Sequence, residues 1–315
     1  MKKVGCLFPL FGLLFLGACT MFQPPTPDPP TPVPATATLT MPTPVVPTPL
    51  PELPGISPEQ VRNSEYLLGF FDQIRMVQLV DGQFQEGAPG STDYISVSVT
   101  DFIARGDLNG DGENEAIAIV AENYGGSGTF VFLAVYQYLN NEAVFLTSIF
   151  LDDRPIINHL EVENGKIFVD AIIHDRDDPM CCPTLETTRH YLLNGINLIL
   201  TDYSTLTPLG DPRAITIEAP VGGARVSGII RLKGNVTIAP FENNLVYRIY
   251  DLGGVELSAG PITVEAMDLG APGTFESAID LGNIITNTTI RITVEDINVA
   301  NGSLFAMDSV ILQVR

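Results

Sequence analysis

The most reactive side chains of this sequence gather in one short segment that carries cysteine and histidine. Cys181 and Cys182 are adjacent, with His174 upstream and His190 downstream. Neighbouring Cα atoms are about 3.8 Å apart, below the usual range for a disulfide, so a bond between the two sulfur atoms would be strained. Three states compete: a vicinal disulfide, two free thiols, and a zinc site completed by the histidines. The disulfide is favoured over zinc, because structural zinc sites usually space their cysteines by two to four residues.

A zinc site would make this segment the centre of a metal-dependent hydrolase, which is the least favoured function. No nucleophile stands beside a general base in a recognisable signature. The glycine-rich run from Tyr124 to Thr129 has neither the Lys nor the following helix of a phosphate loop, so it indicates a tight turn between strands. The sequence therefore predicts a protein that is not an enzyme.

An acidic loop further upstream has a spacing typical of calcium ligands. Gly112 holds the sixth position, where a calcium loop turns sharply, but the twelfth position is Ala118 and a strand follows, so the loop departs from an EF-hand. It looks more like the calcium loops of dockerin modules and integrin-type propeller repeats. Weak structural Ca²⁺ and an ion-free turn between strands are equal alternatives. The candidate ligands are Asp107, Asn109, Asp111, Glu113 and Glu115.

Cys19 offers a further chemistry, because its thiol can accept a diacylglyceryl group. It ends the tetrapeptide Leu16–Cys19, which follows Lys2, Lys3 and an apolar run too short to cross a bilayer as a helix. The tetrapeptide resembles the lipobox of secreted bacterial lipoproteins. The resemblance implies that residues 1–18 are a signal peptide and that lipidated Cys19 anchors the protein to the outer side of the cell membrane. An ordinary signal peptide cut near Ala18 is the alternative.

Residues 19–56 form a spacer between this anchor and the rest of the chain. About half of the 25 prolines lie between Pro24 and Pro54, and Thr-Pro steps favour polyproline II and form no core. At about 3.1 Å per residue, such a spacer could extend roughly 100 Å. The net charge of -21 repels nucleic acid and anionic lipid headgroups, which excludes a nucleic-acid partner.

Residues 57–206 predict an α+β domain built on one antiparallel sheet. Ser57 and Pro58 indicate the start of a short helix to about Tyr66, with Gln60 completing a capping box. Residues 74–85 predict a hairpin around Asp81-Gly82. Alternating apolar residues predict further strands over 95–99, 115–121, 129–139, 143–151, 166–173, 189–193 and 196–200.

Several phrases of this first domain resemble a domain of uncharacterised bacterial lipoproteins of the LppP/LprE type. They are Gly106–Ala116, Gly125–Phe130, Leu151–Ile156 and Asp178–Thr184. The resemblance spans about Val61 to Leu200 and implies a module without implying an activity.

Residues 213–315 predict a second, all-β domain, because strands recur every 8–12 residues with turn residues between them. The expected strands are 215–218, 229–236, 245–251, 256–264, 274–280, 289–295 and 308–314. The phrases 217–220, 230–236, 247–251 and 273–275 resemble the immunoglobulin-like domain of bacterial spore germination proteins. That resemblance implies an immunoglobulin-like β-sandwich that serves as an accessory module in envelope proteins.

Together these features predict a mainly β, membrane-anchored extracytoplasmic lipoprotein that displays two non-catalytic binding modules. Its expected partners are the membrane, through the lipid, and an envelope or extracellular protein or polysaccharide. A structural envelope scaffold is the alternative. No cofactor is certain, and calcium at the acidic loop is the candidate.

Overall fold

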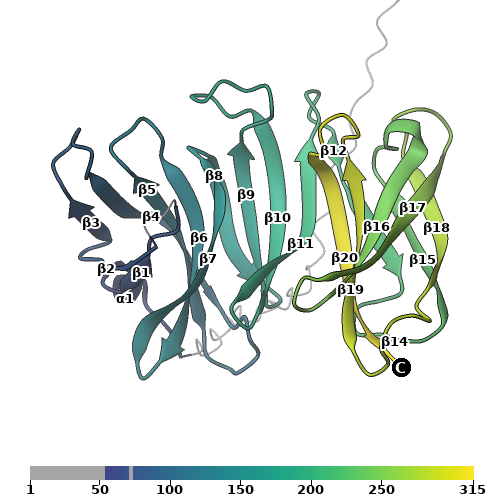
Figure 1. The fold of residues 1–315 in the computed structure, drawn as a ribbon, viewed down its shortest axis with the longest axis horizontal. Helices are drawn as coiled ribbons and strands as arrows, with labels where there is room; N and C mark the ends of the chain where they lie inside the picture. The colour runs from purple at the N-terminus through teal and green to yellow at the C-terminus, as the bar shows by residue number, and fades with distance from the viewer. Residues whose placement is uncertain (1–53, 71–73) are drawn as a thin grey trace, which may run out of the picture. The chain divides into compact units, whose positions relative to one another are not determined.

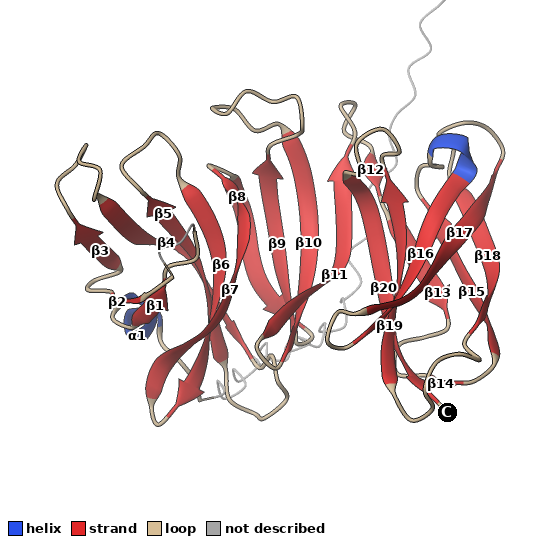
Figure 2. Ribbon diagram, viewed as in Figure 1, coloured by secondary structure: helices blue, strands red, loops and turns tan. Residues whose placement is uncertain are grey.

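The computed structural model describes residues 54–70 and 74–315, and nearly all of its regular structure is β-strand (Figures 1 and 2). In the described part of the chain, helix is confined to α1 (Pro58–Arg62) and the short 3-10 turn η1 (Phe241–Asn243). All strand pairs but one are antiparallel among these residues; the exception joins β14 (Arg225–Val226) to β20 (Leu304–Val314). The prediction of a mainly β, antiparallel protein is therefore confirmed.

Helix α1 begins as its sequence predicts but ends one turn early. Ser57 Oγ accepts a hydrogen bond from the Gln60 backbone N–H, and the Gln60 side chain accepts one from Ser57 N–H, so both halves of the capping box are present. The expected helix to Tyr66 is wrong, because the chain leaves the helix at Asn63 and continues as β1 (Glu65–Leu67). The extended conformation lets Tyr66 and Leu68 point into the core, where both are fully buried.

The predicted hairpin over residues 74–85 is only partly correct. Asp81 and Gly82 both have positive φ, as a tight turn requires. However, β2 (Met76–Gln78) pairs with β1, whereas β3 (Gln83–Glu86) pairs with β4 (Ile95–Gly106). A single bridge between Val80 and Gln83 joins the two arms.

Five strands of the first domain form a sheet with both faces covered. In order across the sheet, β3 and β4 are followed by β5 (Glu115–Asn123), β6 (Phe130–Leu139) and β7 (Glu142–Asp153). Successive β5 residues point to opposite faces, so Ala116, Ala118 and Val120 pack against α1, β1 and β2. Ile117 and Ile119 pack on the other face against the strands that follow in the chain.

Those following strands form a second sheet, so the expectation of one sheet in this domain is wrong. They are β8 (Ile156–Glu163), which the sequence patterns missed, β9 (Lys166–Ile173), β10 (Leu185–Asn194) and β11 (Asn197–Leu206). The chain leaves the first sheet at Arg154, whose φ is +55°, and Pro155, which has no N–H to extend the β7 ladder. Ile167, Val169 and Tyr191 of the second sheet then meet Ile117 and Leu133 of the first in a shared core.

The C-terminal strands enclose a separate apolar core. One group of strands comprises β13 (Ile215–Ala219), β15 (Ile229–Val236) and β18 (Gly273–Asp280). The other group comprises β16 (Asn244–Asp251), β19 (Thr289–Ile297) and β20. Strand β17 (Glu256–Ala266) pairs with β18 of the first group and with β16 of the second. Leu232, Leu245, Ile249 and Ile292 are all fully buried in this core. Each such side chain contributes about 1.5–3 kcal/mol to stability.

Strands β11 and β20 connect the two sets of sheets. They pair at Asp202 with Asp308 and at Tyr203 with Met307. Side chains reinforce the pairing, since Thr205 Oγ1 donates to the Phe305 carbonyl and Ser309 Oγ donates to the Thr201 carbonyl. The short β12 (Pro212–Arg213) also pairs with β11 and holds the linker between residues 206 and 213 against this junction.

Candidate functional site

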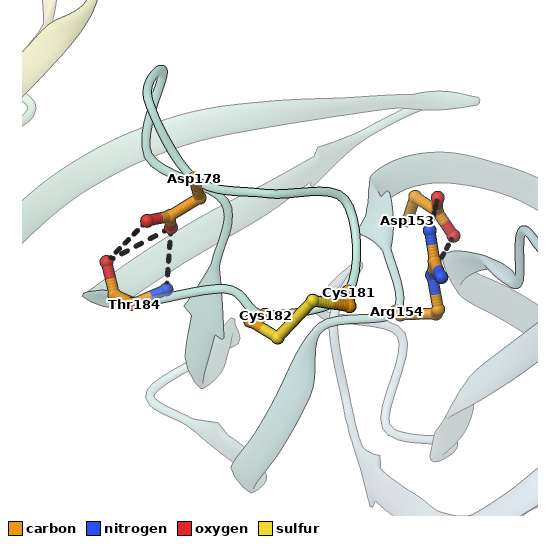
Figure 3. The surroundings of a disulfide bond; sticks show 6 residues. All are labelled: Asp153, Arg154, Asp178, Cys181, Cys182 and Thr184. Atoms are coloured by element: carbon orange, nitrogen blue, oxygen red, sulfur yellow. Dashed lines mark hydrogen bonds and ion pairs between the residues drawn. A yellow bond between two sulfur atoms is a disulfide. The ribbon is translucent and has the colours of Figure 1, made fainter.

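The loop between β9 and β10 carries the cysteine pair. The structure joins Cys181 and Cys182 in a disulfide, with their Cα atoms 3.8 Å apart, and Figure 3 shows the loop around them. Both cysteines are exposed, and the neighbouring Met180 side chain is 64% exposed. The sulfur atoms are therefore available to molecules in solution.

The base of this loop is held by Asp178. Its carboxylate accepts a hydrogen bond from Asp175 N–H at 2.8 Å. It also accepts hydrogen bonds from Thr184 N–H at 2.8 Å and from Thr184 Oγ1, which Figure 3 shows. The bond from Asp175 and those from Thr184 lower the pKa of Asp178. The aspartate therefore ties the two ends of the loop together.

The histidines of the proposed zinc site lie in different places. His174 Nδ1 is 3.0 Å from Asp152 Oδ2, at the β7 side of the loop. His190 pairs with Phe168 across the sheet and contacts Asp202 on β11 at 3.2 Å. Phe168 precedes His174 by six residues on one extended segment, which corresponds to about 20 Å. One metal ion therefore cannot bind both histidines in this fold.

A cleft of about 520 Å³ opens beside the disulfide loop, where the linker runs past it. Asp175 and Thr184 from the loop line one side, and the linker residues 206–210 line another. Leu209 on the linker is 89% exposed. The cleft thus combines hydroxyl groups, carboxylate and exposed apolar surface.

Arg213 and Phe305 also line this cleft. The Arg213 guanidinium lies 4.0 Å from the centre of the Phe305 ring, and its Nε donates to Asp296 Oδ2 at 2.7 Å. Burial raises the pKa of Asp296, and the Arg213 charge opposes that rise. The aspartate and the ring hold the guanidinium in a fixed position, so a paired cation and the aromatic ring stacked on it both line the cleft. The sequence patterns did not single out this group, because its members are far apart in the chain.

The acidic loop between β4 and β5 closes on its own hydrogen bonds. Asp107 accepts from Gly110 N–H at 2.6 Å and from Gly112 N–H at 3.0 Å. Desolvation raises the pKa of Asp107, but these backbone bonds lower it by more, so it lies below its usual value. Asn109 Oδ1 and Asp111 Oδ1 accept from backbone N–H groups two residues further on. These bonds stabilise the turn in the absence of an ion.

Glu115 lies at the buried end of this loop. It is 1% exposed and accepts hydrogen bonds from Leu108 N–H and from the Asn109 side chain. Burial raises its pKa, the bond from Leu108 lowers it, and the charges of Asp111 and Asp107 raise it. Among residues 54–70 and 74–315, no three His, Cys, Asp or Glu side chains are arranged to hold a metal ion. Calcium binding by Asp107, Asn109, Asp111, Glu113 and Glu115 stays a prediction.

A buried carboxylate in β5 is a further group that sequence reasoning missed. Glu122 is fully buried and accepts hydrogen bonds from Tyr66 Oη at 2.7 Å, Tyr124 Oη at 2.6 Å and Gly69 N–H at 3.0 Å. Burial is the main cause that raises the pKa of Tyr66 and of Tyr124, and the contact of each with Glu122 is the second cause. A charged residue within an apolar strand was the available signal for this network.

Cys19 and residues 20–53 of the spacer lie outside the described residues. The last spacer residues are part of the fold, since Gly55 forms a β-bridge with Asn114 and Ile56 is fully buried in the first core. No helix in the described ranges has the length and apolarity needed to cross a membrane. No protein-family model matches the sequence, and a comparison with curated proteins finds no match. The resemblances to the LppP/LprE-type domain and to the immunoglobulin-like domain therefore stay predictions.

Proposed function

We propose that this chain is a lipid-anchored extracytoplasmic protein whose β-rich modules, residues 57–206 and 213–315, bind an envelope or extracellular partner without catalysing a reaction. The observation that carries the proposal is the tetrapeptide Leu16–Cys19 between a basic, apolar start and a proline-rich spacer. The basic, apolar start would direct export, and the cysteine of the tetrapeptide would carry the lipid anchor. The proline-rich spacer would hold the modules away from the membrane.

The architecture of the described residues supports the binding part of the proposal. In the C-terminal module, alternate residues of two strand groups meet in one core, which favours an immunoglobulin-like β-sandwich. In the N-terminal module, α1 packs on the first sheet, which favours an α+β domain. Antiparallel sheets of this kind present rigid loops at their ends, and the cleft with Arg213 and Phe305 lies among such loops.

Metabolic labelling tests the anchor. Cells producing the chain are fed a radioactive fatty acid, and the label on the purified protein is compared between the wild type and Cys19→Ser. Cys6→Ser is the matched control, because it removes a cysteine of the predicted signal peptide. We expect the label and membrane retention to disappear only with Cys19→Ser. Equal labelling of that variant would refute the anchor.

Crosslinking to isolated envelopes tests the binding role. Leu209→Asp introduces a charge at the cleft, whereas Leu269→Asp does so at a similarly exposed leucine in the turn between β17 and β18. We expect a saturable crosslinked product that is lost with Leu209→Asp and kept with Leu269→Asp. Capture that does not saturate, or that both variants preserve, would favour the structural scaffold instead.

A further inference from the structure

The Cys181–Cys182 disulfide contributes little to holding the fold together. A disulfide stabilises a protein mainly by closing a loop of the unfolded chain, and the effect grows with the length of that loop. This bond joins adjacent residues, so it closes almost no chain. Both cysteines are exposed, so the bond also fills no part of the core. Its role must come from its chemistry or from the local shape that it gives the loop.

The loop has supports that do not depend on the sulfur–sulfur bond. Asp178 ties Asp175 to Thr184, and the Cys182 N–H donates to the Pro179 carbonyl at 2.9 Å. Below the loop, β9 and β10 are paired from Ile173 and Leu185 onward. Opening the disulfide therefore leaves the anchoring of the loop in place.

We propose that the Cys181–Cys182 pair is a thiol–disulfide exchange site that a dithiol reductant opens and a disulfide oxidant closes. Exposed disulfides are the labile ones, because an attacking thiolate can reach a sulfur atom. The thiolate of the reductant attacks one sulfur, the Cys181–Cys182 bond breaks, and the departing thiolate takes a proton from water. The second thiolate of the reductant then attacks the reductant's sulfur in the mixed disulfide, and the protein cysteine leaves as a thiolate that takes the second proton. The protein gains two electrons and two protons, and the reductant becomes a disulfide.

The charges around the pair determine which reductants react. The loop that carries the pair holds three carboxylates, at Asp175, Asp177 and Asp178, against one cation at Arg176. Arg154, drawn among the surroundings of the disulfide in Figure 3, is already paired with Asp153 at 2.8 Å. This acidic environment repels anionic thiolates and favours thiols that carry a positive charge or none.

Native-state reduction of the full chain is the first test. The folded protein is treated with dithiothreitol, free thiols are labelled with a maleimide, and peptide mapping separates Cys181 and Cys182 from Cys6 and Cys19. We expect both loop cysteines to be labelled at least tenfold faster than the chain unfolds, with an unchanged circular dichroism spectrum, and the disulfide to re-form with oxidised dithiothreitol. Reduction only upon unfolding, or labelling of both cysteines before any reductant is added, would overturn the proposal. The double variant Cys181→Ser/Cys182→Ser is the control: its circular dichroism spectrum and melting temperature are those of the fold without the disulfide.

Competition between thiols of different charge tests the selectivity. Cysteamine carries a cation and thioglycolate an anion, so their rates are compared at low ionic strength, each normalised to its rate with a small disulfide. We expect cysteamine to be favoured, and Asp177→Asn to reduce that preference by about two- to fourfold because it removes one negative charge from the loop that carries the pair. Asp268→Asn, in the turn between β17 and β18, is the matched control. Normalised rates that are equal in the wild type would refute the role of the acidic loop in selecting the reductant.

Discussion

Asp308 makes the stability of this protein depend on pH at the junction of β11 and β20. Its Oδ2 accepts a hydrogen bond from Ile217 N–H at 2.6 Å, and its Oδ1 accepts one from Ser309 N–H at 2.7 Å. Across the ladder it is the direct partner of Asp202, so two carboxylates occupy neighbouring positions. Burial raises the pKa of Asp308 from 3.8 to about 6; Asp202 adds to the rise, whereas the two hydrogen bonds and Lys166 oppose it.

The sign of the pH dependence follows from these two pKa values. The folded chain holds the Asp308 proton up to about pH 6, whereas the unfolded chain releases it near the usual value of 3.8. This group therefore contributes its full stability below about pH 4, and that contribution is lost as the pH rises to about 6. The difference between the pKa values corresponds to at most about 3 kcal/mol. Because Asp308 is only half-buried, we expect about 1–2 kcal/mol.

Asp308→Asn tests this reasoning. Asparagine has the same shape but does not titrate, so its cost, about 1 kcal/mol for one weakened backbone hydrogen bond, is the same at every pH. The free energy of unfolding is measured by urea denaturation of both chains between pH 4 and pH 7. We expect the advantage of the wild type over the variant to shrink by about 1–2 kcal/mol across this range.

Two comparisons make the Asp308 test decisive. Asp202→Asn removes the carboxylate opposite Asp308, so it should lower the pKa of Asp308. The pH range over which Asp308 changes the stability should then be narrower than in the wild type. Asp280→Asn, an exposed aspartate at the end of β18, is the control for loss of one surface charge. A difference between wild type and Asp308→Asn that stays constant from pH 4 to pH 7 would show that the carboxyl group does not titrate as its burial implies.

Three further perturbations address separate parts of the chain. Ser57→Ala removes the N-cap of α1 and should cost about 1 kcal/mol in urea unfolding, whereas an unchanged midpoint would show that the capping box does not contribute. Gly234→Ala should destabilise the chain by about 1–3 kcal/mol, because the added methyl group would collide with the Thr216 carbonyl and the Phe275 ring; a melting temperature equal to that of the wild type would contradict this packing. If the acidic loop binds calcium, a chelator should lower the melting temperature of the wild type but not that of Asp107→Asn. An equal response of the two chains would show that the loop is an ion-free turn.

Local patterns in the sequence were sufficient for most strands and turns. Asn164-Gly165 and Asn194-Gly195 mark tight turns, and Gly165, Gly195 and Asn164 have the positive φ that such turns require. The residues beside them alternate between apolar and polar, so one face of each strand was identifiable. Strand β8 was missed because its alternation breaks at Asn158 and His159, where a bulge shifts its register against β9, and because Ile156 at its start is exposed.

The sequence by itself determined the mainly β character of the described chain, the helix start at Ser57 and the positions of most turns, because each depends on residues within a few positions of one another. Only the tertiary structure decided that β7 and β8 belong to different sheets, that His174 and His190 lie apart, and that Asp202 faces Asp308. The pairing of strands depends on which buried faces fit together across the whole chain. Local periodicity records that a face is buried but not which other face covers it.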